Sequence, residues 1–474
     1  MELNSVKETV TDTDVLIAGA GPAGLALAVD LARRGVRSAV VEKADRLFPG
    51  SRGKGLQPRT LEVFDDLGVI DAVLESSGPA PVQMIWKDGE RQGEHHMFDP
   101  VAPSPAAPYA GTPRLLPQWR TQEILYARLT ELGGDVSFGN ALTSLTQDAS
   151  GVTAVLSTGA TVRAAYAVAA DGGRSTVRAA LSIPMTGETV DPASMLVADV
   201  RIPSLDRLNW HVFPVEAGFL MLCPLPGTEE FQLAARFPDG ERPDLSPGGV
   251  RALIAARTHL AADDVTEVLW ASDFRPRAAL ADRFRAGRVF LVGDAAHVHS
   301  PAGGQGLNTS IQDAYNLGWK LGRVLRGGAH GSLLDSYEEE RLPNAAEMLG
   351  LSTRVHRGEQ RRGAATQQLG IGYRGGPLSQ GAAGALQAGD RAPGGPLGPR
   401  EGGSLFDAFR GPHFTLLAVG TDAALPALDP GTVHVHRLDT CEPYGKGLFL
   451  VRPDGYIGWA GDDATGLAGY LTRC

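Results

Sequence analysis

Cysteine is scarce in this chain of 474 residues, and the three present, Cys223, Cys441 and Cys474, lie far apart. No two of them have the spacing of a metal site or a redox motif, and an odd number makes a poor disulfide framework. We therefore expect no metal site and a reducing, cytoplasmic setting.

An excess of positive charge and a long apolar run are also missing. Lys and Arg total 44 against 54 Asp and Glu, a formal net charge of −10, which disfavours nucleic acid and anionic membranes as partners. No stretch approaches the ~18 consecutive apolar residues of a membrane span. Residues 1–14 lack the basic and apolar regions of a signal peptide. These absences predict a soluble protein of the cytoplasm.

The chain does have enough apolar sequence for a large core. Hydrophobic residues make up 43%, and the 60 Gly and 32 Pro show no repeating period, which excludes collagen-like and wholly disordered chains. At ~150 residues per domain, the length suggests about three domains.

The N-terminal part has the pattern of an α/β domain with a parallel sheet. A strand, a helix and a second strand are predicted at 14–18, 22–34 and 37–41. Such a unit requires a right-handed crossover. A helix follows at 121–132, and the Pro- and Gly-rich segment 72–117 before it is expected to be mostly loop.

Antiparallel strands are predicted next, at 194–202, 218–223 and 231–237. A buried strand at 288–293 and a helix of about five turns at 306–325 then return to the first domain. We therefore predict a discontinuous first domain, an antiparallel-sheet substrate domain, a linker and a small C-terminal domain. Their boundaries are 12–182 with 274–356, 183–273, 357–401 and 402–474.

The run Gly19-Ala20-Gly21-Pro22-Ala23-Gly24 matches G-x-G-x-x-G between the first strand and the first helix. Gly19 allows a tight turn, Gly21 lets the backbone approach a pyrophosphate, and Gly24 lets helix and strand pack closely. The helix N-terminus, which begins at Pro22 and Ala23, attracts phosphate through free N–H groups such as that of Ala23 and through the positive end of the helix dipole. The pattern predicts a dinucleotide site, and a glycine-rich turn without a ligand is the alternative.

Glu42 ends the second strand, where its carboxylate can accept hydrogen bonds from both hydroxyls of a ribose. A carboxylate here would repel a 2′-phosphate. The position therefore suits FAD or NAD and does not choose between them.

Two further segments carry a resemblance. Residues 169–178 read AADGGRSTVR, and residues 288–308 read RVFLVGDAAHVHSPAGGQGLN. Together with the glycine motif, the sequence resembles the class A FAD-dependent aromatic hydroxylases over nearly its whole length. These single-component flavoprotein monooxygenases include phenol hydroxylases, polyketide hydroxylases of antibiotic biosynthesis and rifampicin monooxygenases. The resemblance implies a Rossmann-like FAD domain with an inserted antiparallel substrate domain.

The same resemblance implies a thioredoxin-like fold for the C-terminal domain, most clearly at 450–456. The domain lacks Cys-x-x-Cys, so thiol redox chemistry is not expected there. Packing or a contact within a homodimer is the expected role.

The resemblance assigns FAD contacts to the second fingerprint region. Asp294 follows a buried strand and is expected to hold a ribityl hydroxyl, with the capping of the next turn as the alternative. The bare backbone at Gly304 and Gly306 is expected to lie against the isoalloxazine ring, and the positive end of the following helix to stabilise the reduced ring. By resemblance, backbone at Leu307 and Asn308 meets the pyrimidine edge, and Pro301 flanks the site of oxygen reaction.

Further contacts are implied outside these fingerprints. Arg52 is expected to contact FAD and to gate flavin movement, which makes it the one tentative catalytic residue, and Lys43 joins Glu42 in the cofactor set. Gln118 matches a glutamine that binds FAD. Asp171 is linked to both FAD and the nicotinamide, with a simple turn aspartate as the alternative. Arg59 and Glu62, beside this region, are expected to be ordinary helix-surface charges.

The resemblance also implies the chemistry. NADH or NADPH reduces FAD, and the reduced flavin captures O2 as a C4a-hydroperoxide that hydroxylates a phenolic or aromatic polyketide-type substrate. No second dinucleotide motif occurs, which is consistent with transient nicotinamide binding, and the choice of NADH or NADPH stays open. We assign no catalytic base.

The substrate pocket is expected between the flavin and the antiparallel domain. Its candidate residues are His211, Phe213, Phe219 and Met221. Alternation places Phe219 and Met221 on one face, with plain core as the alternative. His211 is a weaker candidate for the group that ionises a phenol, because a lone histidine is commonly a surface residue. His297 and His299 lack further ligands for a metal.

Several functions share these motifs. A Baeyer–Villiger oxygenase or an epoxidase acting on a polyketide uses the same flavin chemistry, and some reductases use the same core. A flavin-containing protein that binds an aromatic ligand without converting it is the alternative from another class.

Overall fold

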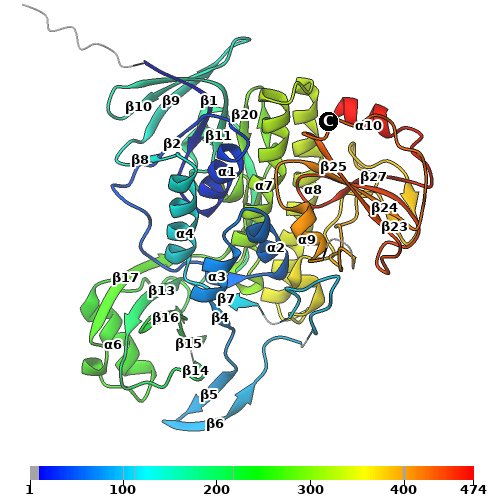
Figure 1. Cartoon of the computed structure of the whole chain (residues 1–474). Helices are drawn as coiled ribbons and strands as arrows, with labels where there is room; N and C mark the ends of the chain where they lie inside the picture. Colours follow the sequence, from blue (N-terminus) through cyan, green and yellow to red (C-terminus); the bar gives the residue numbers. More distant parts are fainter. Residues whose placement is uncertain (1–9, 100, 112, 217, 399–401) are drawn as a thin grey trace, which may run out of the picture.

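The computed structural model describes residues 10–99, 101–111, 113–216, 218–398 and 402–474. Most of the predicted N-terminal polar segment, at 1–9, and the end of the predicted linker, at 399–401, lie outside the described residues. Three large sheets and the helices between them make up the molecule (Figure 1).

The first sheet has eight strands in the order β19-β20-β11-β1-β2-β8, with β10 and β9 added beside β11. β1 (Val10–Ala18) and β2 (Ser38–Val41) run parallel on either side of α1 (Pro22–Ala32) in sequence, which confirms the predicted strand–helix–strand unit. The remaining strands are β8 (Val136–Ser137), β9 (Leu142–Gln147), β10 (Val152–Leu156), β11 (Thr161–Ala169), β19 (Arg285–Ala286) and β20 (Val289–Leu291).

Helices cover this sheet. α1 packs against both α4 (Gln118–Glu131) and α7 (Gly306–Leu325), so α1 is buried along most of its length. α8 (Asp335–His356) continues the helical layer beside α7 and accommodates Pro343 within it. Shorter helices are α2 (Pro58–Asp66), α3 (Ile70–Ser76) and α5 (Thr176–Ala180).

The second sheet has seven strands in the order β17-β13-β16-β15-β14-β5-β6. Its strands are β5 (Gln83–Lys87), β6 (Glu90–His95), β13 (Met195–Arg201), β14 (Trp210–Val215), β15 (Gly218–Pro224), β16 (Glu230–Arg236) and β17 (Glu267–Phe274). Helix α6 (Pro247–Arg257) covers one face, where it completes an apolar core.

The expectation that 72–117 is mostly loop is wrong in part. This segment supplies α3 and the β5–β6 hairpin, and β5 pairs in parallel with β14 of the second sheet. β6 contains no apolar residue and every one of its residues is exposed. It is an edge strand held by its pairing, so hydrophobic periodicity gave no sign of it.

The C-terminal sheet has the order β25-β24-β26-β27. It comprises β24 (Phe414–Val419), β25 (Val433–Leu438), β26 (Gly447–Val451) and β27 (Ile457–Gly461), flanked by α9 (Leu405–Phe409) and α10 (Leu467–Arg473). Trp319 of α7 packs into this part, in an edge-to-face contact with Phe414.

The segment predicted as a linker packs closely where it is described. Its residues Ile371 and Tyr373 are buried against Met348 and Leu351 of α8 and against Tyr456. β22 (Ala382–Ala383) and β23 (Leu386–Gln387) form a small hairpin within it. The domain boundaries themselves stay a prediction.

Two small three-stranded sheets complete the fold. One contains β3 (Gly55–Leu56), β4 (Gly78–Pro79) and β7 (Arg114–Leu115), and the other β12 (Met185–Thr189), β18 (Arg277–Ala281) and β21 (His297–Val298).

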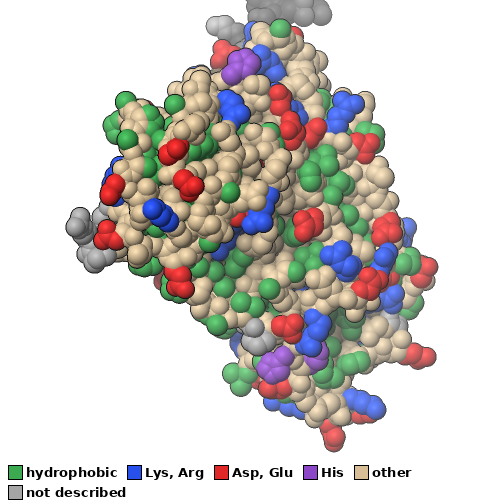
Figure 2. Space-filling model, turned by 90° about the vertical axis from the view of Figure 1, so that its right-hand side faces the viewer, with side chains coloured by type: hydrophobic (Ala, Val, Ile, Leu, Met, Phe, Trp, Pro, Cys, Tyr) green, Lys and Arg blue, Asp and Glu red, His purple; other side chains and the backbone are tan. Residues whose placement is uncertain are grey.

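The surface carries charges of both signs. On the face drawn in Figure 2, acidic, basic and apolar side chains alternate and none of the three gathers into a large patch. Within the described ranges, no helix is long and apolar enough to cross a membrane.

Candidate active site

Four neighbouring strands of the first sheet end at the same level. The register aligns Val41 of β2 with Ala18 of β1, Ala18 with Ala169 of β11, and Ala169 with Leu291 of β20. All four run parallel, and ligands of such sheets bind beyond the carboxyl ends of the strands. The turns that follow carry Gly19, Glu42, Asp171 and Asp294.

The glycine turn after β1 has the geometry that the motif predicts. Gly19 has φ +110°, and a Cβ there would lie 2.3 Å from the carbonyl oxygen of Ala170. A Cβ on Gly24 would lie 2.0 Å from the carbonyl oxygen of Gly19. A Cβ on Gly21 would have no neighbour within 4 Å. Gly19 and Gly24 are therefore required by close backbone approach, and Gly21 leaves open space at the N-terminus of α1.

Glu42 is fixed beside this turn by its own backbone neighbours. Its Oε2 accepts a hydrogen bond from the Ala20 N–H at 2.9 Å, and its Oε1 accepts one from the Ala44 N–H at 3.0 Å. Each oxygen keeps a lone pair for a ribose hydroxyl. The adjacent Lys43 side chain is exposed.

Asp171 caps α5 with one oxygen only. Oδ2 accepts hydrogen bonds from the N–H groups of Thr176 at 2.8 Å and Val177 at 3.2 Å. Oδ1 is buried and finds no hydrogen-bond partner among the described residues. A buried acceptor without a partner is costly, so this oxygen fits a ligand hydroxyl or amide. The turn-capping role and a ligand role are thus compatible.

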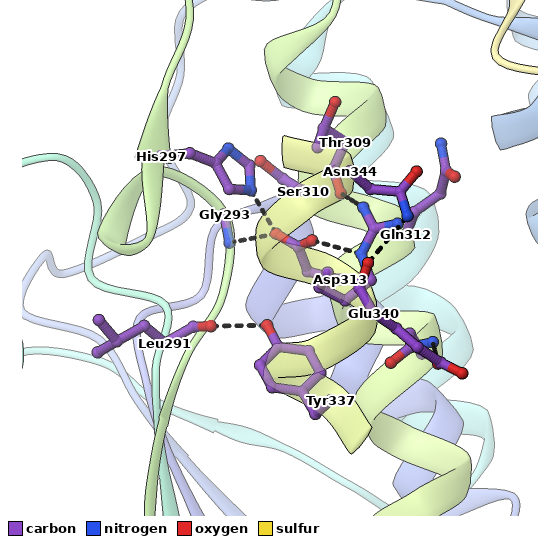
Figure 3. Close-up of polar contacts among 12 residues, drawn as sticks. Leu291, Gly293, His297, Thr309, Ser310, Gln312, Asp313, Tyr337, Glu340 and Asn344 are labelled. Atoms are coloured by element: carbon purple, nitrogen blue, oxygen red, sulfur yellow. Dashed lines mark hydrogen bonds and ion pairs between the residues drawn. The ribbon is translucent and has the colours of Figure 1, made fainter. Parts of the chain in front are cut away.

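The side chain of Asp313 of α7 binds the Gly293–Asp294 turn that follows β20 (Figure 3). Asp313 Oδ2 accepts a hydrogen bond from the Gly293 N–H at 3.0 Å and lies 2.5 Å from His297 Nε2, while Oδ1 lies 2.8 Å from Arg341 Nε. Burial alone would raise the pKa of Asp313, but His297 and Arg341 outweigh it and hold that pKa below its usual range. The carboxylate is therefore a charged anchor for the turn.

Asp294 is placed by this anchor with its side chain exposed. The dense protein around it nevertheless removes part of its hydration, which raises its pKa, while His297 and Arg52 act in the opposite direction. An accessible carboxylate with reduced hydration is suited to accept hydrogen bonds from a hydroxylated chain.

The N-terminus of α7 is built around the side chain of Asn308. Its Oδ1 accepts hydrogen bonds from the Gln57 N–H at 2.8 Å and from Thr60 Oγ1 at 2.7 Å. Its Nδ2 donates to the carbonyl oxygens of Gly55 and Gly304. Because the side chain is fully used, Asn308 can offer a ligand only its backbone.

Gly304 and Gly306 bracket this helix start. Gly304 has φ +64°, the left-handed conformation that glycine adopts readily. The helix has no side-chain cap at Gln305, so N–H groups of its first turn, including that of Leu307, are available to a ligand. Pro301 opens the short 3₁₀ turn before it and is exposed.

Arg52 projects from a loop whose backbone is fixed on both sides. The Ser51 N–H donates to Asp199 Oδ2 at 2.8 Å, and the Gly53 N–H donates to Gln118 Oε1 at 3.0 Å. The exposed Arg52 guanidinium lies 5.0 Å from the ring centroid of Phe48. Gln118 therefore positions the loop in this structure, and the exposed Arg52 side chain has only a long hydrogen bond, 3.5 Å to Ser272 Oγ, and the ring contact.

The prediction that Arg59 and Glu62 are ordinary helix-surface charges is wrong. Both are buried, and Arg59 Nη1 lies 2.8 Å from Glu62 Oε2. Arg59 also donates to the carbonyl oxygen of Asp454, and Arg391 pairs with Glu62 at 3.0 Å. The C-terminal elements cover this face of α2, a long-range contact that the local pattern does not reveal.

The four substrate candidates divide between the faces of the second sheet. Phe219 and Met221 share a face, as alternation predicted, and both are partly exposed. Phe213 belongs to the core under α6 on the other face. His211 is fully buried, with Nδ1 accepting from Trp86 Nε1 at 3.0 Å and Nε2 lying 2.8 Å from the carbonyl oxygen of Asp206. The expectation of a surface histidine is wrong, and the structure does not bring His211 or Phe213 to the site.

His297 and His299 form a pair rather than a metal site. Their rings are joined by a 3.0 Å nitrogen–nitrogen contact. Burial and the neighbouring His297 lower the pKa of His299 to about 3. In the described part of the chain, no three His, Cys, Asp or Glu side chains converge as metal ligands.

Comparisons with known proteins find similarity along nearly the whole chain. A family model described as FAD binding domain matches residues 12–352, and one described as aromatic-ring hydroxylase, C-terminal, matches residues 386–474. A flavin-dependent monooxygenase of Mycobacteroides abscessus is 44% identical over 481 residues, covering 97% of this chain and 99% of that protein.

Two further relatives have named substrates. One is a 12-dehydrotetracycline 5-monooxygenase/anhydrotetracycline 6-monooxygenase of Streptomyces rimosus. It is 35% identical, and the match covers 96% of this chain and 97% of that protein. The crystal structure of aklavinone-11 hydroxylase in a ternary complex with FAD and aklavinone superimposes with a TM-score of 0.82 at 29% identity, covering 97% of this chain and 98% of the other.

Proposed function

The chain belongs to the FAD-dependent aromatic-ring hydroxylase family of flavin-dependent monooxygenases, and we propose that it hydroxylates a phenolic or aromatic polyketide-type substrate with NAD(P)H and O2 as co-substrates. The observation that carries the proposal is the alignment of four strand ends, which gathers Gly19, Glu42, Asp171 and Asp294 along one edge of the first sheet. The N-terminus of α7 completes this edge.

The residues present fit FAD. Gly21 has open space where a pyrophosphate would approach, and Asp171 Oδ1 is a buried acceptor without a partner among the described residues. We assign the ribose to Glu42, the ribityl chain to Asp294, and the isoalloxazine to the backbone of Gly304–Asn308. When bound, FAD supplies the redox and oxygen chemistry, and the chain binds, orients and shields the reactants.

The substrate position follows from the faces of the second sheet. Phe219 and Met221 lie on the face opposite the α6 core, and Met221 packs beside Trp210 and Leu115. This face also contacts the loop that carries Arg52, through the Ser51–Asp199 hydrogen bond. We therefore place the aromatic substrate between this face and the N-terminus of α7.

The C-terminal part has a supporting role in this proposal. We propose a thioredoxin-like fold for residues 402–474, acting through packing against α7 and α8 rather than through thiol chemistry. Cys441 and Cys474 are both buried and free. A homodimer through this part stays a prediction.

The experiment is to follow NADH or NADPH oxidation and oxygen uptake by the purified FAD-loaded protein across phenols and aromatic polyketides, with product masses. Stimulated oxidation with a mass gain of one oxygen atom is the expected result. The product structure separates ring hydroxylation from lactone or epoxide formation. Flavin binding without stimulation by any compound that binds would contradict the proposal and favour a non-catalytic binder.

A further inference from the structure

A row of side chains crosses the face of the second sheet that meets the Arg52 loop. Asp199 of β13 is opposite Gln232 of β16, and Gln232 is opposite Cys223 of β15. Gln232 donates to the carbonyl oxygen of Ser51, and Asp199 accepts from the Ser51 N–H. The row therefore fixes the loop on the face that carries Met221.

Lys54 leaves this loop and points along the row. Its Nζ lies 4.5 Å from the ring centroid of Trp210 and donates a hydrogen bond to Gln232 Oε1. A cation over an indole face is attracted by the ring but not neutralised by it. Trp210 itself has a buried indole N–H without a partner among the described residues.

Arg362 approaches the same apolar cluster as Lys54, through its contact with Met97. Its guanidinium donates to the carbonyl oxygen of Ala302, next to Pro301, and contacts the sulfur of Met97. Met97 packs in one apolar cluster with Trp210 and Met221. The two cations thus converge between the sheet and the turn that precedes α7.

Neither cation has an acidic partner. Among the described residues, no carboxylate lies within ion-pair distance of Lys54 or Arg362, whereas the buried Lys320 lies 2.8 Å from Glu340 and the buried Arg341 2.8 Å from Asp313. The nearest acid in the row, Asp199, has its pKa raised to about 7 by burial. Neither cation is therefore neutralised by a direct ion pair with a described residue, although the nearby Asp199 acts on Lys54 from a distance.

The pKa values of Lys54 and Arg362 are both lowered, as expected for buried cations without an ion-pair partner in the described part of the chain. Burial, together with the positive charge of Arg362, lowers the pKa of Lys54. Burial lowers the pKa of Arg362 to about 10. An anion in this space would relieve both groups, because each would gain a charge-assisted hydrogen bond.

We propose that Lys54 and Arg362 together bind the ionised oxygen of an acidic substrate, a phenolate or an enolate, and so select acidic aromatic compounds. The inference rests on the proposed function, because it places the substrate on this face. The guanidinium fork suits two neighbouring oxygens, as in a 1,3-dicarbonyl enolate or a peri-hydroxyquinone, and the ammonium acts as a point charge. An ionised oxygen also enriches the ring in electrons, which favours attack by an electrophilic oxygen.

The test measures binding alone, with FAD-loaded protein and without NAD(P)H, so that it does not depend on turnover. Pairs of probes differ only by methylation of the acidic oxygen: 4-nitrophenol with 4-nitroanisole, and 1-hydroxyanthraquinone with its methyl ether. Affinities come from the change in the flavin absorption spectrum and from calorimetry. We expect the wild type to bind the ionisable member at least about tenfold more tightly in one or both pairs.

The variants separate this selectivity from general damage. Lys54→Met and Arg362→Met should each lose the preference while retaining FAD, and the methyl ethers should bind them as they bind the wild type. Lys87→Met and Arg361→Met, at exposed positions, are the matched controls and should keep it. Equal binding of both members of every pair by the wild type, no binding of any probe, or a preference that survives in both variants would overturn the proposal. Normal stimulated oxidation with a neutral substrate would overturn it while leaving the proposed function intact.

Discussion

At the scale of single residues, Asp294, which we propose as the ligand of the ribityl chain, stands in a turn that other residues hold in place. Among the described residues no side chain or backbone group donates a hydrogen bond to the Asp294 carboxylate. Its neighbour Gly293 is bound through its N–H to Asp313, which His297 and Arg341 keep charged. The backbone of the turn is therefore held by a charged group of the protein itself, without a ligand. Such preorganisation lowers the cost of binding.

Asp294→Ala should weaken FAD binding by at least about tenfold, because a ribityl hydroxyl loses a charge-assisted hydrogen bond. The measurement is the FAD content of the purified protein and its dissociation constant by fluorescence. Asp462→Ala, an exposed aspartate in the C-terminal part, should purify fully loaded. Full occupancy and unchanged affinity in Asp294→Ala would refute the assignment of the ribityl chain.

The raised pKa of Asp199 leads us to expect that the stability of the fold depends on pH. Burial raises its pKa to about 7, against the opposing hydrogen bonds with Ser51. The folded state therefore holds the proton more tightly than the unfolded state does. This stabilisation is complete below the unfolded carboxyl pKa and is lost as the pH rises through about 7.

Asp199→Asn should remove this dependence, because the amide stays neutral and can still accept from the Ser51 N–H. We expect the variant to melt several degrees above the wild type at pH 8, with the difference shrinking toward pH 5. Melting curves from pH 5 to 8 measure this, and Asp239→Asn, at an exposed position, is the control. Parallel curves for wild type and Asp199→Asn would contradict the raised pKa.

At the scale of elements, the Arg52 loop combines a hydrogen-bonded backbone with an exposed side chain that has only weak contacts, among them a 3.5 Å hydrogen bond to Ser272 Oγ. Ser51 and Gly53 are bonded to Asp199 and Gln118, so Arg52 can move only through its side chain. Phe48 and Trp270 contact each other edge to face, and the Arg52 guanidinium lies beside this pair, 5.0 and 5.9 Å from the two ring centroids. These contacts are weak enough to exchange for contacts with a cofactor.

Arg52→Ala should therefore slow flavin reduction at least about tenfold while changing FAD affinity little, as expected of a gating residue. Stopped-flow reduction by NADPH or NADH under anaerobic conditions gives the rate, and equilibrium titration gives the affinity. Arg46→Ala, an exposed arginine of the same connection, should leave both unchanged. An unaltered reduction rate in Arg52→Ala would remove the gating role.

The elements also show what sequence can predict. The predicted helix at 306–325 agrees with α7, and the predicted strand at 231–237 agrees with β16 to within one residue, because hydrophobic periodicity and flanking glycines are local signals. α8 was not predicted: Pro343 interrupts its pattern, and its buried face includes charged Glu340 and Arg341. Burial of charge depends on partners that lie elsewhere in the chain.

The residues of the candidate site also differ in whether local sequence reveals them. The glycine turn at Gly19–Gly24 and the turn at Gly293–Asp294 are contiguous motifs, so the sequence located them. Lys54 and Arg362 are more than 300 residues apart in sequence, and Arg362 fell in a segment interpreted as a linker. Only the packing of that segment against Ala302 brings the two cations together.

At the scale of the whole molecule, a buried ionic network joins helices α7 and α8, beside the proposed FAD site, to the C-terminal part. Glu340 of α8 lies 2.8 Å from Lys320 of α7 and 2.6 Å from Arg452, which follows β26. Arg452 also pairs with Asp454, and all four side chains are almost wholly buried. The two cations depend on Glu340, and the pKa of Glu340 is lowered to about 2 because Arg452 and Lys320 outweigh its burial.

Glu340→Gln should therefore weaken the union of the two parts. Breaking a buried ion pair from one side costs about 3–5 kcal/mol. In this variant Lys320 stays buried without an acidic partner among the described residues, and Arg452 keeps only Asp454. We expect a lower melting temperature and, in calorimetry, a C-terminal transition that separates from that of the rest of the chain. Glu339→Gln changes the exposed neighbour on the same helix and should melt like the wild type.

The pH response provides a second check on the same network. Because the folded pKa of Glu340 is depressed, its contribution is present above the ordinary carboxyl pKa and is lost as the pH falls through about 2. The difference in stability between wild type and Glu340→Gln should therefore persist from pH 8 to pH 5 and shrink only in stronger acid. A single cooperative transition in Glu340→Gln at the wild-type temperature would mean that apolar packing, such as Trp319 against Phe414, holds the C-terminal part without the ions.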